Sequence, residues 1–335
     1  MIKNYFKIAW RNLVRNKAFS VINISGLALG LACSLLIMLW VQDERRVDGF
    51  HKNGNQLYQV YERHYYDGKI ETSYPTQGLL AEELKRIIPE VQYASGLEYA
   101  SQPGTQNNFE AAEKVSKMGG MFAGADFFNM FSYPLLQGKA ESALNSPAGI
   151  AVSRKMAEYF FGDVEKAMGK TIRYENKEDL MVTAVFENLP ANSSQQFDFL
   201  RSWTDFVKQN NWVNNWGNTS PSSFVQLHTN AAPVKVEAKI KDFIYRYQQK
   251  DKSFYTELAL QSYPEKYLHS TFKNGYVDGG RIEYVRLFSI VAVFILLIAC
   301  INFMNLATAR SAKRAKEVGV RKVVGAKRSA LIWQF

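Results

Sequence analysis

Two long apolar runs without a charged residue constrain this chain more than any other feature of its sequence. Residues 18–41 and 287–309 contain 24 and 23 amino acids, and none of them is charged. At a helical rise of about 1.5 Å per residue, each run is roughly 35 Å long and can cross a bilayer. Because a charge at the centre of such a helix costs about 2.5–3.5 kcal/mol, the runs predict two membrane spans rather than core helices of a soluble protein.

The positive charge of the chain is concentrated next to these runs. The net charge is +10, of which residues 1–17 contribute +5 and residues 310–335 contribute +7, which leaves −2 for the middle. The positive-inside rule therefore predicts that both ends are cytoplasmic and that residues 43–286 lie outside. Residues 1–17 also separate basic from apolar side chains at helical spacing, which predicts an amphipathic helix on the membrane lipid. The same distribution argues against nucleic-acid binding.

The first run does not have the features of a signal segment that is cleaved off. The run is longer than the apolar region of a secretory signal, which is about 7–15 residues. Gly30 stands where a lipoprotein cleavage box around Cys33 has a branched apolar residue. Because Cys33 and Cys300 both fall inside the apolar runs, the external segment has no cysteine and no disulfide framework.

Small and polar residues within the runs predict helix–helix packing. Gly26, Gly30 and Ser34 recur every four residues, so they form a stripe that another helix can approach closely. Asn302 and Asn305 share a face near the cytoplasmic end of the second run and favour a protein neighbour over lipid. The alternative is that small residues are simply common in membrane helices. We expect further helices to pack nearby.

The external segment alternates strand and helix signals, which predicts an α+β domain. Asp67-Gly68 predicts the turn of a β-hairpin. A helix is expected between Thr76, as N-cap, and Pro89, and a short one between Ser153 and Gly162. A longer helix is expected over residues 233–249.

No catalytic motif stands out. Residues 167–171 end like a phosphate-binding loop, but Val164 replaces the first glycine that this loop needs. The four histidines lack the spacing of metal ligands, and no nucleophile elbow is present. We therefore predict a binding or mechanical domain without metal or cofactor, and not an enzyme.

The basic segment behind the second run resembles the cytoplasmic segment of FtsX-like permeases of ABC transporters, which include the MacB and LolC/LolE types. The resemblance is carried by the following residues, and it implies that they couple the permease to the ATPase: Arg314, Glu317, Gly319, Arg321, Lys322, Gly325, Ala326, Lys327 and Arg328. The apolar residues 329–335 that follow look like the start of the coupling helix that docks onto the ATPase. The two glycines interrupt the helical pattern, and we expect them to allow a tight turn.

The resemblance extends over the whole chain. Residues 159–174 and 182–200 are similar to the MacB-type periplasmic domain. The resemblance implies α-helical transmembrane spans that flank a large α+β extracytoplasmic domain. In this domain, the two ends of the external segment would form a porter-like α/β subdomain, and a more β-rich subdomain would be inserted between them. The family continues with at least two more spans, so we expect this chain, which stops at Phe335, to be a fragment.

The resemblance also implies partners and a function. These are a separate cytoplasmic ATPase that binds the ATP, a second permease copy or homologous half, and a periplasmic adaptor as a further candidate, all at the bacterial inner membrane. The function would be that of a permease subunit in efflux, in lipoprotein or peptide export, or in mechanotransmission. By pattern alone, a two-span sensor with an external ligand-binding domain is the alternative.

Overall fold

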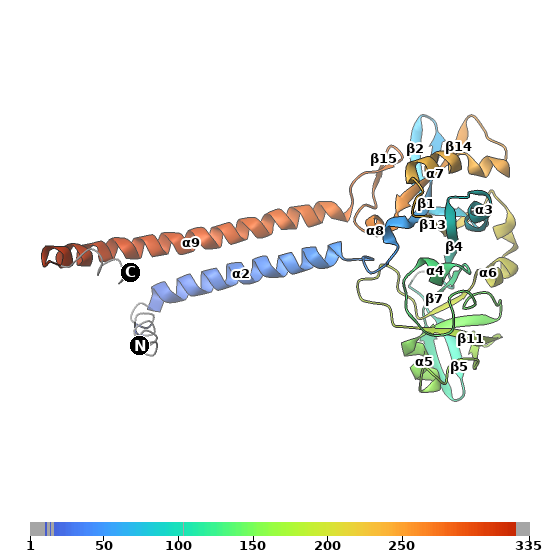
Figure 1. Cartoon of the computed structure of the whole chain (residues 1–335), viewed down its shortest axis with the longest axis horizontal. Coiled ribbons are helices and arrows are strands. Elements are labelled where there is room, and N and C mark those ends of the chain that lie inside the picture. The colour runs from blue at the N-terminus through green and yellow to red at the C-terminus, as the bar shows by residue number, and fades with distance from the viewer. Residues whose placement is uncertain (1–10, 12–13, 15–16, 103, 326–335) are drawn as a thin grey trace. The chain divides into compact units, whose positions relative to one another are not determined.

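The computed structural model describes residues 11, 14, 17–102 and 104–325, and these form two compact units (Figure 1). The first unit contains residues up to Asp43 together with those from Glu283 onward, and the second contains Glu44–Ile282. The bounds of the second unit lie within four residues of those predicted for the external segment, 43–286.

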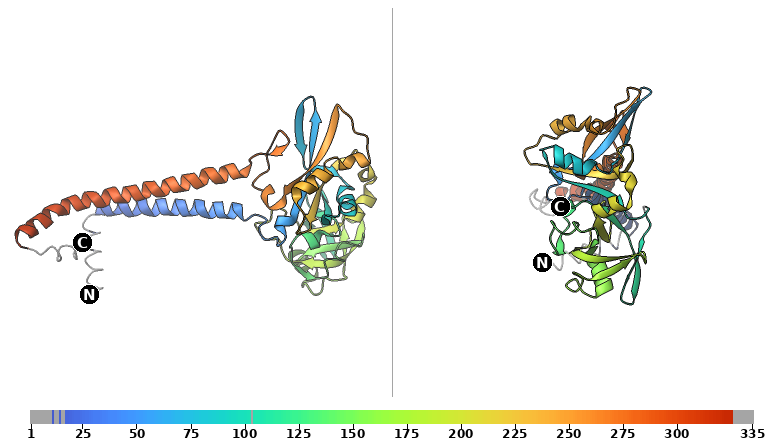
Figure 2. Two further views of the ribbon diagram at one scale, coloured as in Figure 1. Left: turned by 45° about the horizontal axis from the view of Figure 1, so that its top comes forward. Right: turned by 90° about the vertical axis from the view of Figure 1, so that its right-hand side faces the viewer.

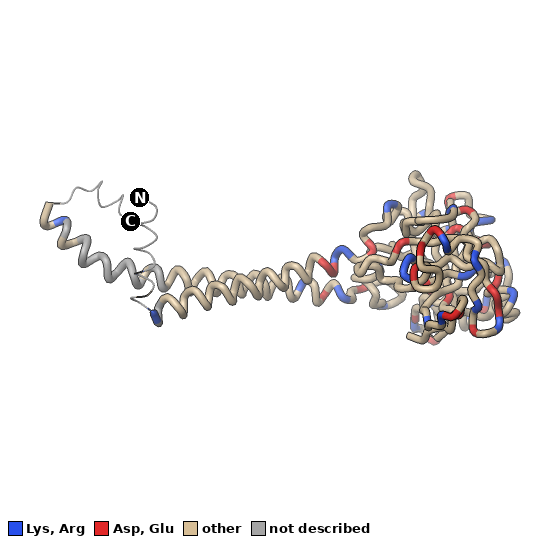
Figure 3. The backbone as a smooth tube through the Cα atoms, turned by 90° about the horizontal axis from the view of Figure 1, so that it is seen from below, with Lys and Arg blue, Asp and Glu red and all other residues tan. Residues whose placement is uncertain are grey.

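Two long helices dominate the first unit. Helix α2 spans Lys17–Arg45, and α9 spans Arg281–Val323 without a break. The parts Ser20–Arg45 and Arg281–Asn305 are long and apolar enough to cross a membrane. In the most apolar 18-residue stretch of each helix, only 6% and 11% is buried, respectively. The core helix of a soluble protein would be mostly buried. Figure 3 shows these stretches free of charged residues except near their ends. The predicted amphipathic helix falls almost entirely on residues outside those described.

The second unit is built on a mixed sheet of 14 strands, counted over the described residues. Its main path runs β14-β1-β13-β4-β7-β12-β9-β11-β10-β5-β6. The pairs β9/β11 and β7/β12 are parallel, and the other neighbours on this path are antiparallel. The fold class predicted from the sequence is confirmed.

The sheet has two parts, which lie at opposite ends of the unit (Figures 1 and 2). The terminal part, residues 57–99 and 219–282, comes from the two ends of the external segment, and the inserted part is residues 107–209. The strands of the terminal part are β1 Leu57–Tyr66, β2 Lys69–Ser73, β3 Pro75–Gln77, β4 Val91–Tyr99, β13 Thr219–Leu227 and β14 Phe254–Ser262, with a separate hairpin of β15 Phe272–Lys273 and β16 Tyr276–Val277. The strands of the inserted part are β5 Asn107–Ala111, β6 Lys114–Met118, β7 Gly120–Ala123, β8 Leu135–Gln137, β9 Gly149–Ser153, β10 Thr171–Tyr174, β11 Glu178–Phe186 and β12 Phe199–Ser202.

Short helices cover the sheet. They are α3 Leu80–Ile87, α7 Pro233–Ile240 and α8 Tyr263–Lys266 in the terminal part, and α4 Phe127–Met130, α5 Arg154–Phe161 and α6 Trp203–Gln209 in the inserted part. Leu84 of α3 and Ile240 of α7 pack on Val60 and Val225 of the sheet, and Phe160 of α5 joins the core of the inserted part. Burial of these apolar side chains stabilises each part at about 25 cal/mol per Å².

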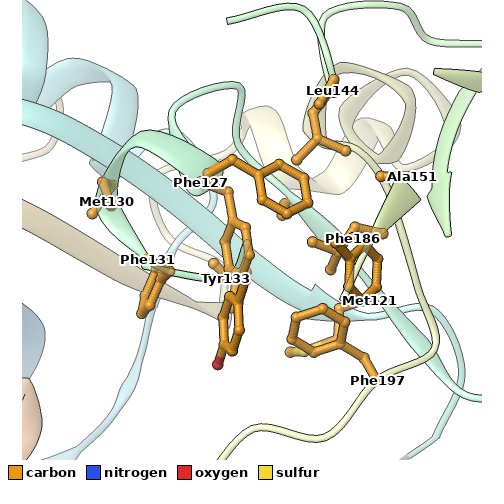
Figure 4. Close-up of a cluster of buried hydrophobic side chains, with 14 of the residues drawn as sticks. Met121, Phe127, Met130, Phe131, Tyr133, Leu144, Ala151, Phe186 and Phe197 are labelled. Carbon is orange, nitrogen blue, oxygen red and sulfur yellow. The ribbon is translucent and has the colours of Figure 1, made fainter. Parts of the chain in front are cut away.

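The two parts also share one core, and Figure 4 labels side chains that the inserted part contributes to it. Phe127, Phe131 and Phe197 of the inserted part belong to the same buried cluster as Phe224 and Tyr263 of the terminal part. The ring centroid of Phe131 lies 5.7 Å from that of Phe224 and 5.2 Å from that of Tyr263. Because protein cores are close-packed, this cluster resists independent movement of the two parts.

Several elements form for the local reasons predicted. Asp67 and Gly68 have φ of 48° and 70°, the left-handed values that a two-residue hairpin turn needs, and they join β1 to β2. The Ser153 side chain accepts the N–H of Met156 at 3.2 Å and caps α5, which ends at Gly162 with φ of 82°. The hairpin and the short helix are therefore confirmed.

Two expectations about helices are wrong. Thr76 does not cap α3, because it lies in β3 and its hydroxyl contacts Ser223 Oγ at 2.7 Å. The helix expected over residues 233–249 stops at Ile240 and is followed by a 3₁₀ turn over Phe243–Arg246. The Lys241 carbonyl accepts the N–H of Leu258 on β14 instead of continuing the helical pattern.

A buried carboxyl in β1 makes the stability of this domain depend on pH. Glu62 is 1% exposed and accepts Gln77 Nε2–H at 2.7 Å, and burial raises the pKa of its carboxyl to about 7. Since the unfolded carboxyl has a pKa near 4.5, the folded state binds the extra proton. Its contribution to stability is complete below pH 4.5 and is lost as the pH rises through 7.

We expect Glu62→Gln to remove this dependence. Relative to wild type, the variant should gain on the order of 2–3 kcal/mol in free energy of unfolding between pH 5 and pH 8, measured by denaturation of the full chain in mild detergent. Glu113→Gln, at an exposed turn, is the matched control and should change little at either pH. Parallel pH curves for wild type and Glu62→Gln would contradict the expectation.

Candidate functional site

The small residues of α2 face α9, and we call this contact the helix seam. A Cβ added at Gly30 would lie 2.6 Å from Ala299 Cβ, and one added at Gly26 would lie 3.1 Å from Asn302 Nδ2. Ser34 Oγ donates to the Ala292 carbonyl at 3.0 Å. The structure thus brings the three predicted residues of α2 together against the second span of the same chain.

The two asparagines of the second span have different surroundings. Asn302 is half-buried beside Gly26 at the seam, whereas Asn305 is exposed. Near the external end, the rings of Trp40 and Phe288 meet edge to face with centroids 5.2 Å apart, a position where aromatic side chains are common in membrane proteins.

The predicted ATPase-coupling residues lie at the end of α9. Positions 314, 317, 319, 321 and 322 are helical, so Gly319 does not interrupt the helix as expected. A glycine in a helix interior costs about 1 kcal/mol, which is too little to break a long helix. The remaining residues of this set, Ala326, Lys327 and Arg328, lie outside the described residues.

The second glycine of the set ends the helix. Gly325 has φ of 92°, and its N–H reaches the Lys322 carbonyl at 3.2 Å. A left-handed residue just past the last turn is the common way to finish an α-helix, and glycine adopts it without steric cost. The segment is therefore a helix followed by a turn at Gly325.

Contacts at the start of the external unit were not anticipated from the sequence. The guanidinium of Arg281 binds the carboxylate of Glu44 through two hydrogen bonds of 3.0 Å and lies 4.7 Å from the ring centroid of Tyr267. Asp48 is 2% exposed and accepts the N–H of Ser194 at 2.8 Å. The only signal for these contacts is that charged residues follow the first run directly, at residues 43–46.

Two protein-family models and several known proteins match this chain. The MacB-like periplasmic core domain matches residues 20–243, and the FtsX-like permease C-terminal domain matches residues 289–335. The macrolide export ATP-binding/permease protein MacB of Haemophilus ducreyi is 23% identical over 341 residues, which cover 98% of this chain and 45% of that protein. The uncharacterized ABC transporter permease YvrN of Bacillus subtilis is 22% identical over 346 residues, with 99% and 81% covered.

A solved structure shares the fold of the external unit. A domain assigned to a permease protein of Porphyromonas gingivalis superimposes with a TM-score of 0.54 at 20% identity, over 71% of this chain and 98% of that domain. The chain spans less than half the length of the Haemophilus protein. The name of that protein describes it as both ATP-binding and permease. Since one family match alone covers more than half of the residues, the chain belongs to the MacB/FtsX-type family of ABC transporter permeases.

Proposed function

We propose that the chain is a permease subunit that conveys the work of a separate cytoplasmic ATPase to the external domain. One observation carries the proposal. Helix α9 is continuous from Arg281 to Val323, so one helix roughly 65 Å long leads from the external domain into the basic segment. ATP would bind to the partner, and the permease would need no cofactor of its own.

The proposed setting is the bacterial inner membrane. Both ends would be cytoplasmic and residues 43–286 periplasmic, because the basic segments flank the spans on the side away from the middle. A periplasmic adaptor would be a further partner of the external domain.

A second permease copy or homologous half would cover part of the lipid-facing surface. Outside the seam, apolar side chains of both spans are exposed, among them Leu29, Leu36 and Ile298. Two helices leave most of their surface without a protein neighbour, and permease subunits that assemble in pairs bury such faces against each other.

The contact with the ATPase would centre on the last turns of α9. Positions 314, 317 and 321 lie three and four residues apart, so they share one face of the helix. The turn at Gly325 ends that face. Arg and Glu at these positions supply charges of both signs for contacts to an ATPase surface, whereas simple anchoring next to the membrane requires only positive ones.

An affinity pull-down tests this function. We expect the full-length wild-type protein, extracted in mild detergent, to retain an ABC ATPase, and the Glu317→Lys/Arg321→Glu variant to lose it at unchanged membrane abundance. Reversal of two charges at one interface disrupts complementary pairs. Glu113→Lys, in the external domain, is the control and should retain the ATPase. Recovery of a kinase, or of no ATPase with wild type, would favour the two-span sensor.

Efflux, export of a lipoprotein or peptide, and purely mechanical signalling to an external partner all use the same coupling from ATPase to external domain.

A further inference from the structure

The stretch between the first span and β1 has contacts that its place in the chain does not predict. We call residues Arg46–Lys52 the base segment. It precedes β1 of the terminal part by only a few residues, yet its hydrogen bonds to residues distant in sequence are made with the inserted part. The Asp48 N–H donates to the Asn192 carbonyl at 2.9 Å, and Asn192 Nδ2 donates to the Arg46 carbonyl at 2.8 Å.

A second loop of the inserted part holds the other end of the base segment. The Lys52 N–H donates to Ser132 Oγ at 2.9 Å, and the Ser132 N–H donates to His51 Nδ1 at 3.1 Å. The base segment is therefore held at two points, about four residues apart, by loops that belong to different stretches of the inserted part. Two such attachments fix orientation as well as position.

Asp48 is the most constrained residue of the base segment. Its φ of 57° is left-handed, which costs a residue with a side chain about 1–2 kcal/mol. Its carboxylate is buried and accepts the Ser194 N–H at 2.8 Å. Burial raises the pKa of this carboxyl, while the hydrogen bonds from Ser194 and the nearby Lys266 oppose the shift. Glycine would make the same turn without strain, but it has no carboxylate to accept the Ser194 N–H.

His51 fills the junction between the two parts of the domain. Its ring lies 5.4 Å from Phe131 and 5.2 Å from Tyr133 of the inserted part, and 5.6 Å from Tyr263 of the terminal part. Burial lowers the pKa of its imidazole to about 4, so the ring is neutral and packs as an aromatic group. The base segment is thus wedged into the shared core rather than laid over the surface.

The second helix is attached elsewhere. The Ile282 N–H donates to the Leu268 carbonyl at 3.0 Å, and Arg281 contacts Glu44 and Tyr267. Leu268 and Tyr267 follow α8 in the terminal part. The start of α9 is therefore held by the terminal part and by Glu44 at the end of α2, whereas the hydrogen bonds of the segment that follows α2 go to the inserted part.

We infer that the base segment is a mechanical anchor, with Asp48 as its positioning residue, through which movement of the first span acts on the inserted part of the external domain. This rests on the proposed function and specifies its route. The two spans would act on different parts of one domain, and the shared core would make both parts respond together.

Hydrogen exchange on the full-length permease with its ATPase in lipid nanodiscs tests the anchor. Asp48→Gly removes the carboxylate but accepts the left-handed φ, so the backbone is not strained. We expect the Ser194 amide to exchange about tenfold faster or more in this variant without nucleotide, because a hydrogen bond to a charged group is lost. Protection of β9, β11 and β12 should be unchanged, which shows that the domain is folded.

Addition of ATP separates anchoring from a merely local effect. In wild type, ATP is expected to alter exchange in the inserted part, and in Asp48→Gly this alteration should be lost while ATPase binding and basal hydrolysis persist. Asp48→Asn keeps an acceptor oxygen and tolerates the same φ, so it should restore the response. Asp67→Gly, at another left-handed aspartate on an exposed turn, is the control and should behave as wild type.

The outcomes are distinct. A wild-type ATP response in Asp48→Gly overturns the anchor, as does a loss of response in Asp48→Gly that Asp48→Asn fails to restore. If Asp48→Gly does not fold, Asn192→Ala, which removes only the contact to the Arg46 carbonyl, should weaken the response, and an undiminished response would overturn the anchor. If no ATPase associates with wild type, the proposed function itself fails, and the Ser194 exchange without nucleotide still reports on the attachment of the base segment.

Discussion

Replacing Arg201 by alanine is expected to lower the free energy of unfolding by about 3–5 kcal/mol. The Arg201 side chain is 1% exposed and forms ion pairs with Asp205, on the first turn of α6, and with Glu178 of β11. Its guanidinium also lies 4.4 Å from the ring centroid of Tyr174 and 5.1 Å from that of Phe122. Without Arg201, the largely buried carboxylate of Asp205 has lost its charge partner, and this uncompensated charge accounts for most of the cost.

Chemical denaturation of the full chain in mild detergent measures the effect. Arg173→Ala, which breaks an exposed ion pair with Asp179, is the matched control and should cost no more than about 1 kcal/mol. The triple variant Arg201→Met/Glu178→Gln/Asp205→Asn should recover most of the loss, because no unpaired charge remains. Equal losses for Arg201→Ala and Arg173→Ala would show that burial of the pair has no energetic consequence.

The elements that could be predicted are those fixed by neighbours in sequence. The Asp67-Gly68 turn and the helix between Ser153 and Gly162 depend on left-handed residues and a side-chain cap within a few positions. The two apolar runs are recognisable because a membrane span requires only length and the absence of charge. In each case the whole physical cause lies inside one window of the sequence.

The elements that could not be predicted depend on distant partners. Thr76 matches the pattern of an N-cap, but its hydroxyl is taken by Ser223 on a neighbouring strand, 147 residues away. The expected long helix after Pro233 ends early because the Lys241 carbonyl pairs with the edge strand β14. Such competition between local and tertiary hydrogen bonds is invisible until the sheet order is known.

The residues of the candidate site also differ in how far the sequence could predict them. The stripe of Gly26, Gly30 and Ser34 indicates that a helix approaches, but periodicity does not say which one. Asp48 carries no motif at all, since its partner Ser194 is 146 residues away. Gly319 shows the opposite error, because one glycine costs about 1 kcal/mol in a helix interior and this cost does not end a helix as long as α9.

Replacing Gly30 by alanine is expected to weaken the helix seam by about 1–3 kcal/mol. The added Cβ would lie 2.6 Å from Ala299 Cβ, whereas carbon atoms in contact are about 3.5–4.0 Å apart. The neighbour is a methyl group attached directly to the backbone, so no side-chain rotation can relieve the overlap and the two helices must separate. Separation would also lengthen the hydrogen bond from Ser34 to the Ala292 carbonyl.

A double-mutant cycle separates this overlap from other effects of the added methyl group. Ala299→Gly removes the opposing methyl, so Gly30→Ala/Ala299→Gly should regain most of the thermal stability lost by Gly30→Ala, with a coupling energy of about 0.5–3 kcal/mol in detergent-solubilised protein. Gly319→Ala is the control, because an added Cβ there has no atom within 4 Å among the described residues, and it should be neutral or stabilise by up to about 1 kcal/mol. Additive losses in the double variant would mean that Gly30 and Ala299 do not meet in the membrane, and that the small-residue stripe of α2 faces a helix other than α9.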